Sequence, residues 1–262
     1  MRMLLNTTNM NVEKLYLFPL LFAALVPVTL LITYIIAVSD DDVYPFFPYV
    51  SDTGTLPPES CVFGQFLNIA ALLILITVCV RYKQLDTFWS SQDAATKFPK
   101  TNNVALVMGV LAALGLSIVA NFQVDHVKSV HIIGAFFAFI VGGMYFYIQA
   151  YISWSTRDIP GSSKIVRVAQ LIICVLYAVF AIIGIVTVIV GKSKLGPSTI
   201  LTREWSPEYA GYAEHVVSTV MEWLGTFLIC AFALTFVPEF KQLNLELTFK
   251  IKNVDSNLMP SA

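Results

Sequence analysis

Six long apolar runs, separated by short polar segments, dominate the hydrophobic pattern of this 262-residue chain. Each run is about as long as a helix needs to cross the ~30 Å hydrocarbon core of a bilayer. Because backbone polar groups in lipid must be satisfied within their own element, we predict that the runs are helices. A β-barrel would show short alternating segments instead. The predicted spans cover about residues 17–38, 61–80, 104–121, 130–153, 168–191 and 216–237.

The connections between these runs are short, and none is long enough to form a separate soluble domain. We therefore expect an all-α fold, a single six-span transmembrane helical bundle over residues 1–240. In the remaining tail, residues 241–262, apolar and polar positions alternate from 243 to 252, which is typical of a strand. We expect this tail to be flexible or in weak contact with the membrane, with pairing to a partner's sheet edge as an alternative.

Composition supports a membrane protein. The chain is 57% hydrophobic and only 13% charged, and its mean hydropathy is +0.74. A soluble domain of this size has no core large enough to hide so much apolar surface. The chain also lacks a basic stripe for nucleic acid, a glycine-rich phosphate loop and the motifs of soluble hydrolases, so nucleic-acid binding and soluble-enzyme chemistry are not expected.

The basic residues predict the orientation of the bundle. Segments that share a side with the N-terminus hold twelve Lys and Arg residues, and the segments on the other side hold four, Lys128, Lys192, Lys194 and Arg203. Cytosolic segments are enriched in Lys and Arg, so both termini are predicted to be cytosolic. The outer segments are acidic, and they carry Asp40, Asp41, Asp42, Asp52, Glu59, Asp125, Glu204 and Glu208.

The first outer loop contains the polar, proline-rich string PYVSDTGTLPPES at residues 48–60. Asp52, Thr53 and Gly54 match the tripeptide of aspartic proteases, but that chemistry needs two such carboxylates that share a proton. A structural turn is the better interpretation, because Asp bonds nearby backbone groups and Gly permits positive φ. Glu59 suits the N-terminus of the following helix, where an acid stabilises the helix dipole.

A second group of polar side chains is predicted within the outer half of the bundle: Asn121, His131, His215 and Glu222. Glu222 lies about 12 Å deeper than Glu214 along one helix, at 1.5 Å per residue. An ionisable group at that depth is costly, so it should face a partner or a wet cavity.

Three interpretations of this intramembrane cluster remain open. The side chains form a buried network that fixes helix register, they bind a lipid headgroup or an ion, or His131, His215 and an acid hold zinc in a hydrolase. No compact motif of metal ligands supports the third interpretation, and no cofactor is expected.

Several blocks of sequence recur in a recognisable order along the chain: residues 48–55, 57–60, 63–64, 81–83 and 118–123, then His131 with Gly134 and Ala135, 204–207, Tyr212, 215–218, and Glu222 with Trp223. Together they resemble the damage-regulated autophagy modulator (DRAM) family, which lies within a wider group that includes the transmembrane protein 150 proteins. The blocks fall in the family's order and spacing over nearly the whole chain.

The resemblance implies a lysosomal or late-endosomal membrane protein that promotes autophagy and, in some members, cell death. It transfers no catalytic activity, so we expect a protein that binds membrane lipids, or other membrane or autophagy proteins, and is not an enzyme. The alternatives are a lipid-modifying enzyme or lipid transporter, and a plasma-membrane scaffold for a phosphoinositide kinase. The wider group also includes a Golgi protein of GPI-lipid remodelling, which keeps the Golgi as an alternative location.

Overall fold

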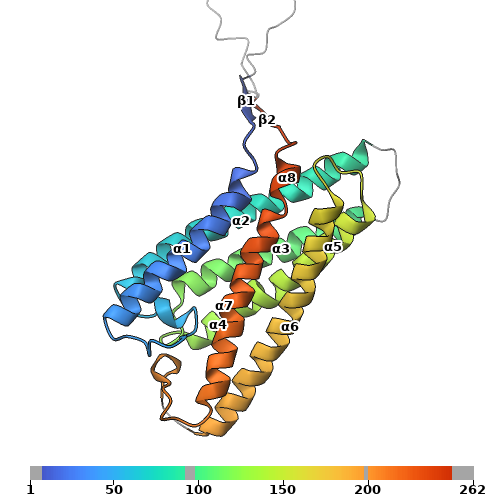
Figure 1. Cartoon of the computed structure of the whole chain (residues 1–262). Helices are drawn as coiled ribbons and strands as arrows, with labels where there is room; N and C mark the ends of the chain where they lie inside the picture. The colour runs from blue at the N-terminus through green and yellow to red at the C-terminus, as the bar shows by residue number, and fades with distance from the viewer. Residues whose placement is uncertain (1–7, 92–97, 198–199, 250–262) are drawn as a thin grey trace, which may run out of the picture.

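The computed structural model describes residues 8–91, 98–197 and 200–249, most of which are helical. Within these residues, six helical stretches are long and apolar enough to cross a membrane, as predicted (Figure 1). In chain order they are α1 (Leu17–Ser39), α2 (Glu59–Ser90), α3 (Phe98–Asn121), the continuous stretch of α4 (Lys128–Ala135), η2 (Phe136–Val141) and α5 (Gly142–Ser155), then α6 (Lys164–Leu195), and α7 (Tyr212–Leu234) with the short α8 (Val237–Phe240).

Two of these helices are much longer than a bilayer crossing requires. α2 and α6 each have 32 residues, or about 48 Å at 1.5 Å per residue. Such a helix exceeds the hydrocarbon thickness and must tilt or project into the interfacial region. α2 continues ten residues past the predicted end of its span, because its last turns pack on other helices.

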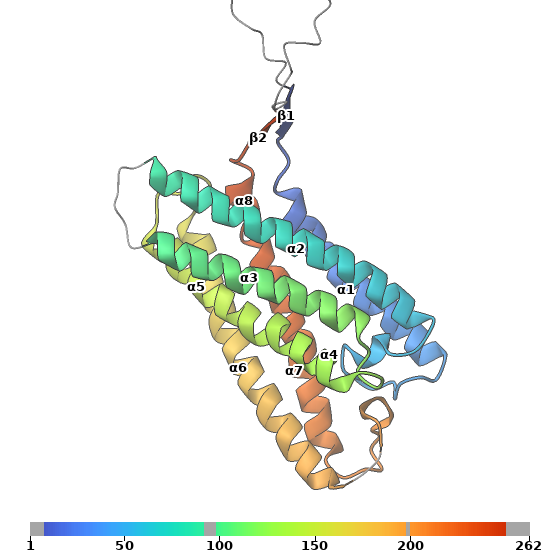
Figure 2. The same cartoon turned by 180° about the vertical axis from the view of Figure 1, so that it is seen from behind.

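The six spans form a closed ring in chain order. Each span packs against the next one along the chain, and α7 closes the ring against both α6 and α1. Figure 1 shows α7 running between α1 and α6, and Figure 2 shows α2, α3 and α5 on the opposite side. α6 contacts only α5 and α7 extensively, so most of its apolar side chains face outward, where lipid would cover them.

The bundle has two distinct ends. At one end, called here the terminal end, the first and last strands pair: β1 (Thr8–Val12) runs antiparallel to β2 (Leu245–Phe249), with Thr8 opposite Phe249. At the other end, called here the loop end, lie the α1–α2, α3–α4 and α6–α7 connections (Figure 1). β1 and β2 therefore lie on the same side of the bundle, as an even number of spans requires.

Within the predicted tail, the alternating pattern forms the strand Leu245–Phe249, which pairs with β1 of the same chain. The remainder of the tail, residues 250–262, lies outside the described residues.

Candidate functional site

The α1–α2 connection folds back into the loop end of the bundle and is bonded to α7. The Trp223 indole N–H donates to the Pro48 carbonyl at 2.9 Å, and the Tyr49 hydroxyl lies 2.5 Å from Ser218 Oγ. The backbone N–H of Val50 donates to Glu222 Oε2 at 3.0 Å. Residues 48–55, called here the docked segment, therefore form part of the packed interior rather than an exposed loop.

The tripeptide Asp52–Gly54 forms a buried 3₁₀ turn, η1, within the docked segment. Thr53 Oγ1 lies 3.1 Å from Thr33 Oγ1 of α1. A Cβ atom at Gly54 would lie only 2.3 Å from Phe63 Cγ, so any side chain there would displace the Phe63 ring. These contacts support the structural turn that the sequence analysis favoured over protease chemistry.

Asp52 is a buried acid with one oxygen bonded and one not. Its Oδ1 accepts a hydrogen bond from Thr202 Oγ1 in the α6–α7 connection at 3.0 Å, whereas Oδ2 has no partner in the described part of the chain. Burial raises the pKa of Asp52 to about 7, although the bond from Thr202 opposes that shift. Asp52 therefore exchanges its proton near neutral pH and joins two loop-end connections.

Glu59 is the first residue of α2, as the sequence analysis expected from its fit to a helix N-terminus. Its side chain is fully buried, and Oε1 accepts from the backbone N–H of Leu56 at 3.0 Å. An acid in the first helical turn stabilises the helix dipole and satisfies a free N–H group.

The residues of the predicted intramembrane cluster contact separate groups rather than one another. Asn121 pairs through its side-chain amide with Asn68 of α2, at 3.0 Å in both directions. His131 Nδ1 lies 2.7 Å from the Phe122 carbonyl oxygen. The His215 ring lies between Trp205, stacked at 4.7 Å between centroids, and Tyr49, which meets it edge-on at 5.1 Å.

Glu222 and His131 nevertheless line the same cavity. This central cavity, of about 100 Å³, lies inside the ring and is otherwise mostly apolar. His131 and Glu222 thus face the same cavity, whereas Asn121 pairs with Asn68 and His215 stacks on Trp205. The predicted cluster is therefore not a single group of side chains.

A second and larger cavity, called here the lateral groove, lies between α4 and η2 on one side and α6 and α7 on the other. Its volume is about 430 Å³, within the range of small-molecule sites. Tyr49, Ser218 and Glu222 provide its polar groups, and the remaining walls are apolar. Glu222 borders both the lateral groove and the central cavity.

The wall between the two cavities contains a turn that the sequence did not predict. η2 is π-helical, and Phe139 from this turn lines both spaces. The Tyr177 hydroxyl of α6 donates to the Phe139 carbonyl at 2.8 Å. Single π-helical turns inside α-helices recur at functional sites.

A buried ionic network at the terminal end was also missed. Arg81 of α2 and Glu239 of α8 form an ion pair with both side chains inaccessible to solvent. Arg81 also donates to Gln149 at 3.0 Å and to Gln84 at 2.8 Å. From the sequence, Arg81 contributes to the predicted topology and to a family block, but a charged residue at the end of an apolar run gives no indication of its partner.

The group of side chains placed closely enough to share a metal ion lies elsewhere. Within residues 8–91, 98–197 and 200–249, it consists of Asp40, Asp42 and Glu59 at the loop end. The zinc set of the hydrolase interpretation, His131 and His215 with an acid, is not such a group.

Six membrane-length helices and a polar site within the loop end of the bundle define an integral, multi-pass membrane protein. A family model described as "Frag1/DRAM/Sfk1/Cwh43P N-terminal domain" matches residues 14–243. The chain belongs to this family, which confirms the resemblance drawn from the motifs.

Individual relatives are similar over most of the chain. DNA damage-regulated autophagy modulator protein 2 of Mus musculus is 37% identical over 219 residues, 83% of this chain and 80% of the relative. DNA damage-regulated autophagy modulator protein 1 of Homo sapiens is 35% identical over 221 residues, 84% and 89% of the two chains. Modulator of macroautophagy TMEM150B-A of Xenopus laevis is 39% identical over 140 residues, 51% and 58% of the two chains. No solved structure matches.

Proposed function

We propose that this chain is a lysosomal or late-endosomal membrane protein that modulates autophagy by binding a membrane lipid in the lateral groove, without catalysing a reaction. The names of the relatives support the process, since modulators of autophagy match over most of the chain. The groove supports the mode of action.

The observation that carries this proposal is the composition of the groove. One part of its lining holds a carboxylate and two hydroxyls, from Glu222, Ser218 and Tyr49, while the rest is aliphatic and aromatic. A lipid has the same division between headgroup and acyl chain. Because the Glu222 carboxyl group accepts hydrogen bonds, it favours a headgroup with ammonium, hydroxyl or amide donors.

The acidic loop end supports the compartment. Under the positive-inside rule the loop end faces away from the cytosol, toward the lumen of an organelle. The proton exchange of Asp52 near neutral pH would make the docked segment responsive to luminal acidity.

A groove-filling substitution tests lipid binding. Ala181 lines the groove, so Ala181→Phe should reduce the lipid that co-purifies with the protein, measured by mass spectrometry. Ile182 is the next residue on α6, is 63% exposed, and does not line the groove, so Ile182→Phe is the matched control. In cells that lack the protein, only Ala181→Phe should fail to restore autophagic flux.

Equal lipid content and equal rescue by both variants would contradict the groove as the functional site. A lipid that is chemically changed only when Glu222 is intact would instead favour the alternative of a lipid-modifying enzyme. A lipid-modifying enzyme and a lipid transporter are the second candidates, because each would also need a lipid-sized groove.

Location is tested by tagging the chain at its endogenous locus and imaging it against lysosomal, Golgi and plasma-membrane markers. Lysosomal or endosomal signal is expected. Plasma-membrane signal would favour a phosphoinositide-kinase scaffold, for which the terminal end should be necessary and the groove dispensable. Golgi signal would favour a role in GPI-lipid remodelling.

A further inference from the structure

We propose that the loop end of the bundle holds a divalent cation, of the Ca²⁺ class, between Asp40, Asp42 and Glu59. The three residues come from the two ends of the α1–α2 connection, so a bound ion would link the end of α1 to the start of α2. This site is separate from the lateral groove and does not rest on the proposed function.

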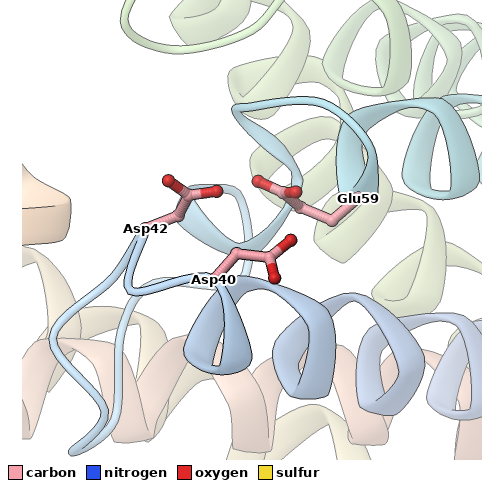
Figure 3. Close-up of side chains that lie close together, drawn as sticks. All are labelled: Asp40, Asp42 and Glu59. Carbon is pink, nitrogen blue, oxygen red and sulfur yellow. The ribbon is translucent and has the colours of Figure 1, made fainter.

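The side chains converge on one point. Figure 3 shows the carboxylates of Asp40, Asp42 and Glu59 directed toward one another, and one oxygen of each lies within 4.8 Å of the others. Ca²⁺ binds oxygen at 2.3–2.6 Å, so ligands on opposite sides of the ion lie about 4.6–5.2 Å apart. The spacing therefore fits a common oxygen-bound ion.

Local backbone geometry places the two aspartates on the same side. α1 ends in a hydrogen-bonded turn in which Asp42 N–H donates to the Ala37 carbonyl at 2.8 Å and Asp41 N–H donates to Val38. Asp41 is left-handed, with φ 59°, as the residue after a helix C-cap commonly is. This reversal brings Asp42 back beside Asp40.

The buried member of the group points to a ligand independently of the clustering. Glu59 is 0% exposed, and its Oε2 has no hydrogen-bond partner among the described residues. Figure 3 shows this carboxyl group directed at the two aspartates. A buried oxygen without a partner is costly, and a cation shared with Asp40 and Asp42 would remove that cost.

The charge around the group also favours a cation. Asp40 caps the C-terminus of α1, the end of a helix at which negative charge is disfavoured and positive charge is favoured. The nearest arginine, Arg203, donates to the Asp42 backbone carbonyl at 2.9 Å, but its ion pairs are with Asp125 and Glu204. Within the described part of the chain, the three carboxylates have no ion pair of their own.

The donor set selects the class of ion. Three carboxylates offer hard oxygen ligands only, which suit Ca²⁺ and Mg²⁺, whereas zinc prefers nitrogen and sulfur. Mg²⁺ demands near-ideal octahedral geometry at 2.0–2.1 Å, and Ca²⁺ accepts irregular sets completed by water. Accessibility falls from exposed Asp40 through half-buried Asp42 to buried Glu59, which gives the ion a path from solvent.

Calorimetric titration of the purified full chain in detergent, after treatment with a chelator, tests the site. We expect one Ca²⁺ to bind with Kd about 10⁻⁴–10⁻³ M, the range of weak extracellular modules, and more tightly than Mg²⁺ or Zn²⁺. Asp42→Asn and Asp40→Asn should each weaken binding at least about tenfold. Neither change touches the buried core, and circular dichroism would verify the fold.

Asp41→Asn is the matched control, because Asp41 lies between the two ligands, is exposed and is outside the cluster. Its affinity should stay within about threefold of the natural chain, since Asn accepts the left-handed conformation equally well. Three results would each overturn the proposal: no Ca²⁺ binding at Ca²⁺ concentrations up to about 10 mM, a loss of affinity in Asp41→Asn as large as in Asp40→Asn and Asp42→Asn, or tighter binding of Zn²⁺ than of Ca²⁺.

Discussion

The buried carboxyl group of Asp52 makes the stability of the docked segment depend on pH. The pKa of Asp52 is about 7 in the folded chain against an ordinary value of 3.8. The folded state therefore holds the proton more tightly than the unfolded state. Stability that depends on this proton is fully present below about pH 4 and is lost as pH rises to about 7.

We predict that the free energy of unfolding falls between pH 4 and pH 7, by about 4 kcal/mol at most from Asp52, since each pKa unit corresponds to 1.36 kcal/mol. Asp52→Asn cannot titrate and keeps an acceptor for Thr202, so its pH dependence should be flatter than that of the natural chain. Thermal unfolding in detergent across this range measures the difference. Asp41→Asn, at an exposed position in the same connection, should leave the slope unchanged; equal slopes for all three proteins would contradict the role of Asp52.

Glu222 has two separable roles at the residue scale, as an acceptor for the docked segment and as a polar group of the groove. Glu222→Leu should leave an inserted, helical protein that no longer restores autophagic flux. Since it leaves the Val50 N–H without an acceptor, we expect a loss of about 1–3 kcal/mol in stability. Thermal unfolding and the flux assay measure the two effects.

Glu222→Gln distinguishes the two roles, because the amide oxygen still accepts from Val50 but carries no charge. Restored stability without restored flux would support a functional role for the carboxyl group itself. Loss of steady-state protein in both variants would favour the purely structural interpretation of this residue.

At the scale of elements, α2 connects the two polar regions of the bundle. Its first residue, Glu59, supports the loop end, and Arg81, six turns further along, is paired with Glu239 of α8. Arg81 also lies over the Phe236 ring, 5.2 Å from its centroid. The extra length of α2 beyond its apolar run is therefore used for packing at the terminal end.

Arg81→Met should destabilise the bundle by about 3–5 kcal/mol, because it leaves Glu239 buried without its partner. Lys83→Met is the control on the same helix: Lys83 forms an exposed pair with Asp86, and such pairs contribute about 0–1 kcal/mol. Denaturation monitored by circular dichroism compares the two variants. The double variant Arg81→Met with Glu239→Gln should recover part of the loss; a loss from Arg81→Met no larger than the control's would show that the pair is unimportant.

At the scale of the whole molecule, the ring of six spans places the paired strands β1 and β2 on one side and three acidic connections on the other. The distribution of Lys and Arg predicts that the terminal end is cytosolic. Cysteine labelling tests this orientation. The two exposed cysteines of the natural chain, Cys61 and Cys79, would react with the reagent, so both are first replaced by alanine.

In that background, Lys100→Cys near the start of α3 should react with a membrane-impermeant thiol reagent when only the plasma membrane is permeabilised. Glu208→Cys in the α6–α7 connection should react only after the organelle membrane is also opened. Both positions are exposed in the structure. The reverse pattern would invert the orientation and place the candidate cation site in the cytosol.

The apolar pattern predicts all six spans, but it groups polar residues that the structure separates. Asn121, which was predicted to share one cluster with Glu222, pairs instead with Asn68 of α2. The groove depends on the π-helical turn at η2 and on Tyr177 of another helix, and neither has a local signal in the apolar pattern. The approach of Asp40 and Glu59 requires the whole α1–α2 connection to return on itself, which no spacing rule reports.

The sequence by itself determined the six helices, because the length of an apolar run and the thickness of a bilayer are local quantities that need no knowledge of neighbours. Motif order also determined the family. Only the tertiary structure decided that residues 48–55 dock inside the bundle, that Glu222 borders two cavities, and that three acids share one point. Those features arise from contacts between residues as many as 175 positions apart, and they depend on how the ring closes rather than on any local pattern.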